Sequence, residues 1–320
     1  MVAASTKSVP ESDRQIWMDG ELIPWSEATV HILSHSHQRG SLVFDYMSVH
    51  ETPRGPALFR MREHVARLLE SARLIGLPIE RGADELSAAI LETVRANPGS
   101  TAVKVSAYFP SVEVDVVPLD PHVSVAIAAY DPRRDIVEPK QLGGMPQAKT
   151  VKLWIEKQLR NRREDIVPPQ AKSSANYASP MAAKWNARRR GYDEVLLLDE
   201  DGFLAEGPTT NVFLVDGEGV LRTPPEDKVL LGITRSSILE IARDEGLPVK
   251  EQPLRPEDLF AASEAFLTGT TAGVWPIASV DDRPIGSGEV PGPVSRRLSR
   301  RFRKITAGDD AVFESWLTFV

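Results

Sequence analysis

The residue with the clearest chemical potential is Lys172, which lies in the segment AKSSANY at residues 171–177. A lysine amine among small, uncharged neighbours can be desolvated and shifted toward its neutral, nucleophilic form. Pro168 and Pro169 stiffen the backbone that leads to it. These residues are typical of a lysine that forms a Schiff base, although a solvated lysine beside serines is a commoner reading of the same pattern.

The residues after Lys172 predict a helix and then a β-meander that positions further polar groups. In chain order we expect a helix over Ser179–Arg190, a strand over Glu194–Leu198, a turn at Asp199–Gly202, a short strand at Phe203–Ala205 and another over Asn211–Val215. Glu206 ends the short strand, where an ordinary hairpin-end carboxylate is the plainer interpretation.

Six ordered motifs together resemble the fold-type IV, or class IV, pyridoxal-phosphate aminotransferases. They are K-x-x-x-N-Y (Lys172, Asn176, Tyr177), G-Y-x-E (Gly191, Tyr192, Glu194), L-L-D-x-x-G (Leu197 to Gly202), E-G-x-x-x-N-x-F (Glu206 to Phe213), L-G-I-T-R (Leu231 to Arg235) and x-G-T-x-A (Thr268 to Ala272). The resemblance extends from about Gln15 to about Arg303, and the motif residues are most similar to those of the branched-chain amino acid aminotransferases.

The resemblance implies an α/β (mixed α+β) fold with a small N-terminal α/β domain, a larger C-terminal pseudobarrel domain and a homodimer. We expect a flexible tail over residues 1–14, the small domain over 15–130, an interdomain linker over 131–144 and the large cofactor-binding domain over 145–320. The linker is placed by Asp-Pro, Glu-Pro and Gly-Gly pairs between Asp131 and Gly144.

The amino-acid composition indicates the broad class of protein. The chain has 320 residues, of which 42% are hydrophobic and 26% charged, which is ordinary for a globular protein with two cores. A net charge of −7 argues against nucleic acid as a partner, and no apolar run has the length of a signal peptide or membrane span. The absence of cysteine fits a reducing compartment, so we expect a cytoplasmic protein.

The N-terminal domain should open with a hairpin around Asp19-Gly20, followed by three histidines at positions 31, 35 and 37. Their spacing places no obvious ligand set on one face, so we expect no metal site. A strand over Ser41–Ser48 and an amphipathic helix within residues 59–76 follow. Further elements are expected as a helix over Asp84–Arg95, strands over Ala102–Phe109 and Val123–Tyr130, and late helices over Thr234–Glu245 and Val294–Ile305.

The family resemblance implies a role for each candidate site residue. Lys172 would be the catalytic lysine that holds pyridoxal 5'-phosphate as a Schiff base, Glu206 would keep the ring nitrogen protonated, and Tyr177 would bind the phenolic oxygen. The phosphate would be bound by Arg67, Ile233, Thr234 and Thr270. Arginine suits phosphate because its rigid fork makes paired, charge-assisted contacts.

Substrate recognition is less determined by the motifs. A branched-chain-type enzyme usually has tyrosine where this chain has Arg39, a glycine-rich segment at residues 44–48, an arginine near Val105 and an acidic residue at Gly273. We expect Arg39 to bind the substrate carboxylate, with exposure to solvent or a place at a dimer interface as the equal alternative; Arg160, Arg162 and Arg163 are secondary candidates. The expected pocket residues are Val43, Phe44 and Tyr46, of which strand alternation would send only some inward, together with Thr271 and Ala272.

The activity implied is ping-pong transfer of an amino group from a hydrophobic, branched-chain-like amino acid to a 2-oxo acid. Both partners would be small molecules, with no nucleic acid or membrane involved. Two alternatives remain open: a lyase resembling aminodeoxychorismate lyase, and a D-amino acid or (R)-amine transaminase. A cofactor-free relative is disfavoured because Lys172, Tyr177, Glu206 and Arg67 are all present.

Overall fold

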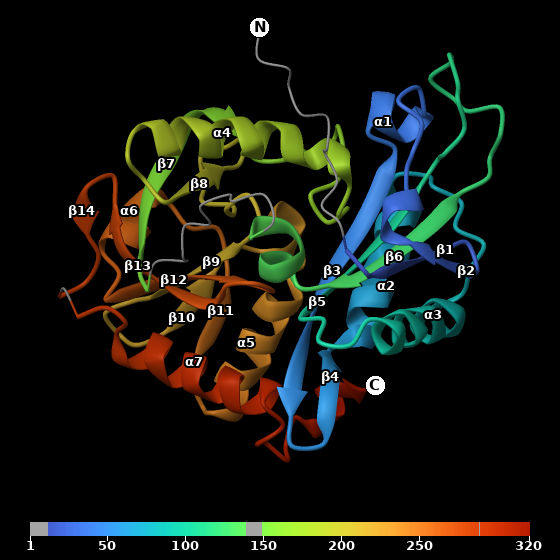
Figure 1. The fold of residues 1–320 in the computed structure, drawn as a ribbon. Coiled ribbons are helices and arrows are strands. Elements are labelled where there is room, and N and C mark those ends of the chain that lie inside the picture. The colour runs from blue at the N-terminus through green and yellow to red at the C-terminus, as the bar shows by residue number, and fades with distance from the viewer. Residues whose placement is uncertain (1–11, 139–148, 288) are drawn as a thin grey trace, which may run out of the picture. The chain divides into compact units, whose positions relative to one another are not determined.

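The computed structural model describes residues 12–138, 149–287 and 289–320, and Figure 1 traces its fold. The chain divides into two compact units, residues 1–146 with 316–320 and residues 147–315. Within the described part of the chain, no helix combines the length and apolarity needed to cross a membrane.

Unit 1 is built on a seven-stranded sheet in the order β15-β4-β3-β5-β6-β1-β2, and each neighbouring pair in it is antiparallel. Its strands are β1 (Gln15–Met18), β2 (Glu21–Pro24), β3 (Leu42–Thr52), β4 (Gly55–Phe59), β5 (Ala102–Tyr108), β6 (Ser124–Tyr130) and β15 (Leu317–Phe319). Its helices are η1 (Trp25–Glu27), α1 (His35–Arg39), α2 (Met61–Leu74), α3 (Ala83–Ala96) and the π-helix η2 (Pro132–Val137).

The helices α2 and α3 cover one face of this sheet (Figure 1). Alternation along β3 explains why: Val43, Met47 and Val49 are buried in the core with apolar residues of α2 and α3, whereas the intervening apolar side chains are only half-buried. The predicted stripe of α2 is confirmed, since Val65 and Leu68 are buried in the same core. The helix stops at the predicted Gly76, which adopts the left-handed φ of 72°.

Unit 2 contains an eight-stranded mixed sheet in the order β11-β10-β9-β12-β13-β7-β8, with β14 paired to β13. Its strands are β7 (Val151–Arg160), β8 (Glu194–Leu198), β9 (Asn211–Val215), β10 (Leu221–Thr223), β11 (Val249–Glu251), β12 (Glu264–Gly269), β13 (Gly273–Val280) and β14 (Arg283–Pro284). Its helices are η3 (Ser174–Tyr177), α4 (Ala178–Arg189), η4 (Glu226–Lys228), α5 (Ile233–Asp244), α6 (Pro256–Phe260) and α7 (Pro293–Thr306), and η5 (Glu314–Trp316) leads into unit 1.

Within unit 2, α4 packs on β7 and β8, while α5 and α7 pack on each other and on β12 (Figure 1). The central strands β8 and β9 are buried at every position, which explains their largely apolar sequence. The expected strand at Phe203–Ala205 is reduced to one bridge between Leu204 and Leu198, and the Leu204 amide donates to the Leu254 carbonyl, 2.7 Å away.

The ends of unit 1 differ from the boundaries that the sequence predicted. Residues 1–11 of the predicted tail and 139–144 of the predicted linker lie outside the described residues. The described start of the linker is the π-helix η2, whose Asp135 forms a buried ion pair with Arg14 at 2.9 Å. At the other terminus, β15 pairs with β4 and Trp316 packs edge-on against Phe59, so the last five residues belong to unit 1.

Arg14 was expected to belong to a flexible tail, but its ion pair with Asp135 holds it in unit 1. Its guanidinium also donates to the Asn97 and Pro98 carbonyls and to the Ser100 hydroxyl. Arg14→Met should lower the free energy of unfolding by about 3 kcal/mol, because it leaves the Asp135 carboxylate buried without this partner.

Chemical denaturation followed by tryptophan fluorescence measures this loss. The matched control is Arg133→Met, whose side chain is 85% exposed and paired with Glu138, so its change should stay within about 0.5 kcal/mol. Equal effects of the two substitutions would contradict a structural role for Arg14.

Candidate active site

Lys172 lies just before the single turn of η3 and meets a residue at the end of that turn. Its Nζ donates to the Tyr177 Oη at 3.1 Å and lies 5.8 Å from the centre of the Tyr177 ring. Both side chains are half-buried. The five-residue spacing of the motif thus places an amine and a phenol within hydrogen-bonding distance across one short helical turn.

The asparagine of the same motif fixes the backbone on the N-terminal side of the lysine. Asn176 Nδ2 donates to the carbonyls of Pro168 and Ala171, at 3.1 and 3.0 Å. Because Asn176 is buried and the Ala171 side chain is fully buried, the backbone that leads to Lys172 is held in place. The motif residues predicted from spacing are therefore brought together.

Glu206 is a carboxylate of unit 2 with many hydrogen-bond donors around it. Its side chain is buried and forms an ion pair with Arg162, with 2.8 Å between Arg162 Nη1 and Glu206 Oε1. Asn161 donates to Oε1 and Asn211 to Oε2, at 3.4 and 3.3 Å. The Leu230 amide donates to both oxygens. Three segments distant in sequence therefore converge on one carboxylate.

The same arginine connects Glu206 to the lysine segment. Arg162 Nε donates to the Asn176 carbonyl at 3.3 Å, and its guanidinium lies 5.0 Å from the centre of the Tyr177 ring. Burial raises the pKa of Glu206 above its ordinary value, while the charges of Arg162 and Lys172 and the donated hydrogen bonds oppose that rise. The lysine, the phenol, the arginine and the carboxylate thus form one electrostatically connected group.

Glycine is required where the motifs approach one another. A Cβ at Gly207 would overlap the Thr210 hydroxyl, and a Cβ at Gly232 would overlap the Asn211 amide. The Gly269 position is similarly close to the backbone of Thr209. The glycines of three separate motifs therefore enclose the loop that follows Glu206.

Two buried hydroxyls in this region have no hydrogen-bond partner among the residues that the structure describes. They are Thr210 Oγ1 and Thr268 Oγ1, and both residues are at most 7% exposed. Thr268 pairs with Asn211 across the β9–β12 ladder, so the two hydroxyls belong to neighbouring strand ends. A buried hydroxyl without a partner is unfavourable, which is typical of a site that is completed by a bound group.

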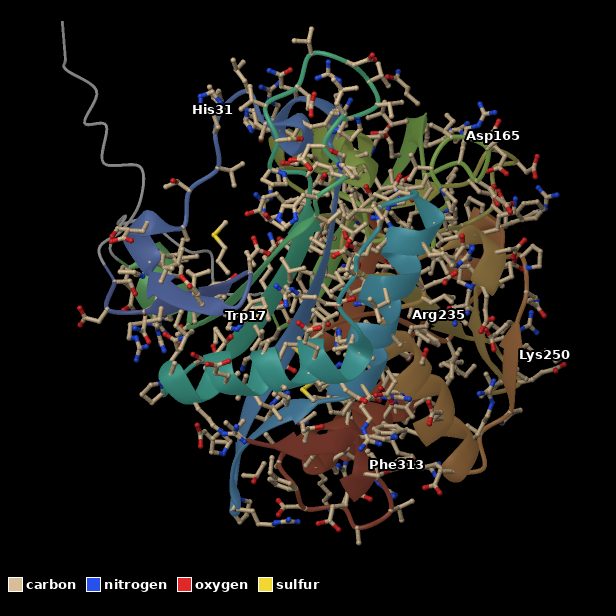
Figure 2. All side chains as sticks on the ribbon, turned by 90° about the vertical axis from the view of Figure 1, so that its right-hand side faces the viewer. Trp17, His31, Asp165, Arg235, Lys250 and Phe313 are labelled. Carbon is tan, nitrogen blue, oxygen red and sulfur yellow. The ribbon has the colours of Figure 1, made fainter. Side chains whose placement is uncertain are left out.

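The N-terminus of α5 carries the two predicted phosphate residues. Ile233 and Thr234 are the first two residues of this 12-residue helix, which Gly232 precedes in extended conformation. The next residue, Arg235, is labelled in Figure 2 and is only 1% exposed. Its Nη2 donates to the Glu251 carboxylate and to the Pro224 carbonyl. Arg235 therefore anchors the helix, and the helix start offers backbone N–H groups that favour an anion.

The predicted residues Thr270, Thr271 and Ala272 form the turn between β12 and β13, closed by the Gly269–Gly273 pair. Since β12 lies beside β9, this turn stands next to the loop that follows Glu206. All three side chains are at least partly exposed.

In unit 1, Arg67 makes a paired contact to a fully buried carboxylate. Its Nε and Nη2 donate to the two oxygens of Asp45, each at 2.8 Å, and His64 Nδ1 lies 2.6 Å from the same carboxylate. Burial alone would raise the pKa of Asp45, but the charges of Arg67 and His64 and their hydrogen bonds hold it well below its usual value. The ion pair fixes α2 on β3.

The structure places Arg39 in a pocket of unit 1 of about 540 Å³. Arg39 donates to the Val114 carbonyl at 2.6 Å and to the Gln38 side chain at 2.9 Å. The pocket is lined by His35, Arg39, Ser41, Ile75, Gly76, Pro78, Phe109, Val116, Val117, Pro118 and Pro121. That lining includes neither Phe44 nor Tyr46, so Arg39 is not brought together with these other residues predicted to contact substrate.

Phe44 and Tyr46 lie on the face of β3 that points away from α2, and both are half-buried. Val43, which was expected beside them, is fully buried in the helix-facing core. This division follows the strand period of two residues, which was expected to send only some of the three side chains inward.

His35, one of the three histidines noted in the sequence, has local partners. His35 is buried, with Nδ1 2.7 Å from the Ser41 hydroxyl and Nε2 2.8 Å from the Val116 carbonyl. Among residues 12–138, 149–287 and 289–320, no cluster of three or more histidine, aspartate or glutamate side chains is arranged to hold a metal ion.

The site and the fold now allow the chain to be assigned to a protein class. The sequence profile of the family described as "Amino-transferase class IV" matches residues 42–280. This protein belongs to the class IV aminotransferases and is a pyridoxal-phosphate-dependent aminotransferase, which confirms the resemblance that its six motifs indicated.

Two relatives of this chain are branched-chain-amino-acid aminotransferases. The branched-chain-amino-acid aminotransferase of Salmonella typhimurium is 34% identical over 305 residues, covering 94% of this chain and 96% of the relative. The Pseudomonas aeruginosa enzyme of that name is 33% identical and covers 98% of this chain and 99% of the relative.

Solved structures give the same result for the fold. The branched-chain amino acid aminotransferase of Thermoproteus uzoniensis, solved with norvaline, matches with a TM-score of 0.87 and 34% identity, covering 96% of this chain and 99% of its own. That of Thermobaculum terrenum, solved in its PLP form, matches with a TM-score of 0.84 and 30% identity, covering 97% of this chain and 98% of its own. The predicted two-domain class IV fold is confirmed.

The sequence alone missed the partners of the charged residues. Arg162 was a secondary candidate for the substrate carboxylate, yet it binds Glu206. Asp45, which binds Arg67, was not singled out, although an acidic residue in the middle of an apolar strand is a signal that a buried partner is needed.

Asp45 gives a prediction with a defined pH dependence. Asp45→Asn should lower the free energy of unfolding by about 3 kcal/mol near neutral pH, because it leaves Arg67 without its carboxylate. Since the folded-state pKa is depressed, this contribution is complete above the ordinary value of 3.8 and is lost as pH falls through and below it.

Urea unfolding of wild type and variant between about pH 7 and about pH 3 measures the difference. Glu70→Gln on the exposed face of the same helix is the control, with an expected change below about 0.5 kcal/mol. A difference that grows as the solution is acidified would contradict the assignment.

Proposed function

We propose that this enzyme uses pyridoxal 5'-phosphate to transfer the amino group of a branched-chain or similarly hydrophobic amino acid to a 2-oxo acid in a ping-pong reaction. The observation that carries the proposal is the connected group of Lys172, Tyr177, Arg162 and Glu206. A general proton carrier, a phenol and a buried carboxylate are the groups that this chemistry requires.

The residues present fit the cofactor. The unpartnered hydroxyls of Thr210 and Thr268, the glycine-lined loop after Glu206 and the anion-favouring start of α5 are features of the described chain that a bound phosphorylated ring would satisfy. Lys172 would hold the cofactor covalently, and Ile233, Thr234 and Thr270 would bind the phosphate. Arg67 would also bind the phosphate, because a guanidinium makes paired, charge-assisted contacts to phosphate oxygens.

When bound, pyridoxal phosphate supplies an electron sink for the negative charge that develops at the substrate carbon. Lys172 Nζ, freed once the substrate amine takes its place, would remove a proton from the substrate carbon and deliver it to the cofactor carbon. Tyr177 Oη, 3.1 Å away, orients that amine. Glu206 offers a carboxylate to the ring nitrogen, and Arg162 keeps that carboxylate in position within a buried surrounding. Thr271 and Ala272 would contact the substrate from their exposed turn.

The substrate class is supported by the relatives. Those named above are branched-chain-amino-acid aminotransferases, and a further structure of an enzyme of that name contains 4-methylvaleric acid. Phe44 and Tyr46 offer aromatic surface of the kind that suits an aliphatic side chain. For Arg39, which lines a pocket of unit 1, binding of the substrate carboxylate is likewise a proposal.

A single-turnover experiment tests the activity. Holoenzyme mixed with L-leucine and no acceptor should release about one equivalent of 4-methyl-2-oxopentanoate per subunit and then stop, as ping-pong transfer requires. Lys172→Ala should lower this release by more than about a hundredfold, because the proton carrier is lost.

Lys250→Ala, on the edge strand β11, is the matched control and should release the same amount as wild type. If L-leucine releases nothing while D-amino acids or chiral amines react, the donor assignment is wrong. If pyruvate is formed from aminodeoxychorismate without any acceptor, the lyase alternative replaces it.

We further propose a cytoplasmic homodimer, the location resting on the cysteine-free sequence. The dimer is supported by two neighbouring segments of unit 1, joined by the Ser34–Val112 bridge, that expose large apolar side chains. These are Val30, Ile32, Leu33, Val112, Val114, Val116, Val117 and Leu119, each between 47% and 94% exposed. An apolar surface of this kind is typical of an interface.

The pair of substitutions Val114→Asp and Leu119→Asp should convert the dimer to a monomer in sedimentation velocity experiments, because charges would be buried on association. Ile166→Asp is the control, since Ile166 is 72% exposed in unit 2 and should leave the assembly unchanged. A wild-type protein that sediments as a monomer at all concentrations would contradict the dimer.

A further inference from the structure

The short helix η4 of unit 2 precedes α5 in the chain and has its carbonyl groups capped by side chains from another segment. The last carbonyls of a helix have no donor within it, and in a turn of three residues this concerns nearly every carbonyl. Gln170 Nε2 donates to the carbonyls of Glu226 and Asp227, at 3.1 and 3.0 Å. Asn161 Nδ2 donates to the third carbonyl, that of Lys228, at 3.2 Å. Side chains that come before the catalytic lysine in the chain therefore bind every carbonyl of η4.

Gln170 lies two residues before Lys172, in a turn whose backbone is held in place. The Ala171 amide donates to the Pro168 carbonyl at 3.0 Å, which closes the turn around Gln170. Asn176 Nδ2 donates to the same carbonyl and to that of Ala171. The Gln170 side chain is half-buried, and its two hydrogen bonds join this turn to η4.

η4 is also joined to the first turn of α5. Arg235, the third residue of that helix, donates through Nη2 to the Pro224 carbonyl at 3.0 Å, and its Nη1 lies 4.0 Å from the Glu226 carboxylate. The Leu230 amide, between the two helices, donates to both oxygens of Glu206. The lysine segment, η4 and the start of α5 are thus linked in series within unit 2.

We propose that Gln170 is a positioning residue of the cofactor site, which holds the segment of Lys172 at a fixed separation from the start of α5. The inference rests on the proposed function, in which Lys172 binds the aldehyde end of pyridoxal 5'-phosphate while Ile233 and Thr234 bind its phosphate. Condensation of the lysine amine with the aldehyde forms a C=N bond and releases water. Because the phosphate is held at the other end of the cofactor, this bond is favourable only when the amine lies at the matching distance.

Two forms of the cofactor separate positioning from folding. Pyridoxal 5'-phosphate forms the bond to Lys172, whereas pyridoxamine 5'-phosphate carries an amine in place of the aldehyde and forms no such bond. Both forms share the ring and the phosphate. A loss of positioning therefore weakens the retention of the aldehyde form alone, while a general loosening of the site weakens the retention of both.

The experiment measures release of the cofactor from full-length holoenzyme loaded with one form or the other, followed after dilution by absorption and fluorescence. Gln170→Met keeps the length of the side chain and removes its donors. It should release pyridoxal phosphate about tenfold faster than wild type, because the amine no longer lies at the matching distance. Release of pyridoxamine phosphate should stay within about twofold of wild type.

Two further variants test the contact itself. Gln170→Lys restores a donor of similar reach and should return the release of pyridoxal phosphate to within about threefold of wild type. Gln158→Met makes the same chemical change at an exposed position of β7 and should behave as wild type with both forms of the cofactor.

The outcomes distinguish this inference from the function on which it rests. If Gln170→Met speeds the release of both forms equally, Gln170 only supports the fold and the inference is overturned. If it changes neither release, the contacts to η4 have no positional effect and the inference is likewise overturned. Lys172→Ala should itself speed the release of pyridoxal phosphate, because the bond is lost. If Lys172→Ala retains it as firmly as wild type, the proposed place of the cofactor on Lys172 is wrong, and the inference fails with it.

Discussion

The arrangement of the candidate site depends on keeping one carboxylate, that of Glu206, inside unit 2. An isolated carboxylate in such a place is strongly disfavoured, so its stability requires a full set of donors. Arg162, Asn161, Asn211 and the Leu230 amide supply them from three stretches of chain. Each donor is thereby fixed, and the loops that carry it are fixed with it. The network thus acts as a positional constraint more than as a source of stability, because ion pairs of this kind contribute little beyond the cost of burying them.

Unit 1 also contains a buried carboxylate, but the pKa of that group is shifted in the opposite direction. Asp45 is also completely buried, but it receives two donors from Arg67 and one contact from His64, all from a single helix. Its pKa is depressed, whereas that of Glu206 is raised. The difference follows from the balance of burial against opposing charge. Asp45 is therefore held as an anion that fixes α2 on its strand, whereas burial outweighs the opposing charges around Glu206.

The sequence predicted contacts between residues that are close in the chain better than contacts between distant residues. Lys172 and Tyr177 meet because their spacing spans one short turn, so a local motif is sufficient. The five longest helices and seven of the described strands were likewise predicted, since their hydrophobic period is a local property. The short helices α1 and α6 and the remaining strands were not predicted. Partnerships over long range were not. Nothing near Arg162 indicates that Glu206, 44 residues later, is its partner. The return of β15 to unit 1 also escaped detection, because a three-residue strand carries too little pattern and depends on Phe59 packing against Trp316.

Residues that select a substrate are the hardest to predict, because their direction depends on strand register. The absence of an arginine at position 105 suggested that the usual carboxylate contacts were rearranged, and Arg39, in another segment, was the cation that the sequence offered instead. A shift of one position along a strand reverses the face that a side chain occupies. Val105 therefore belongs to the core, whereas its neighbour Lys104 lies on the opposite face, with its Nζ 4.8 Å from the centre of the Phe44 ring. The motif residues around Glu206 are fixed by a buried network, whereas the direction of a side chain on β5 depends on a strand register that the sequence alone does not determine.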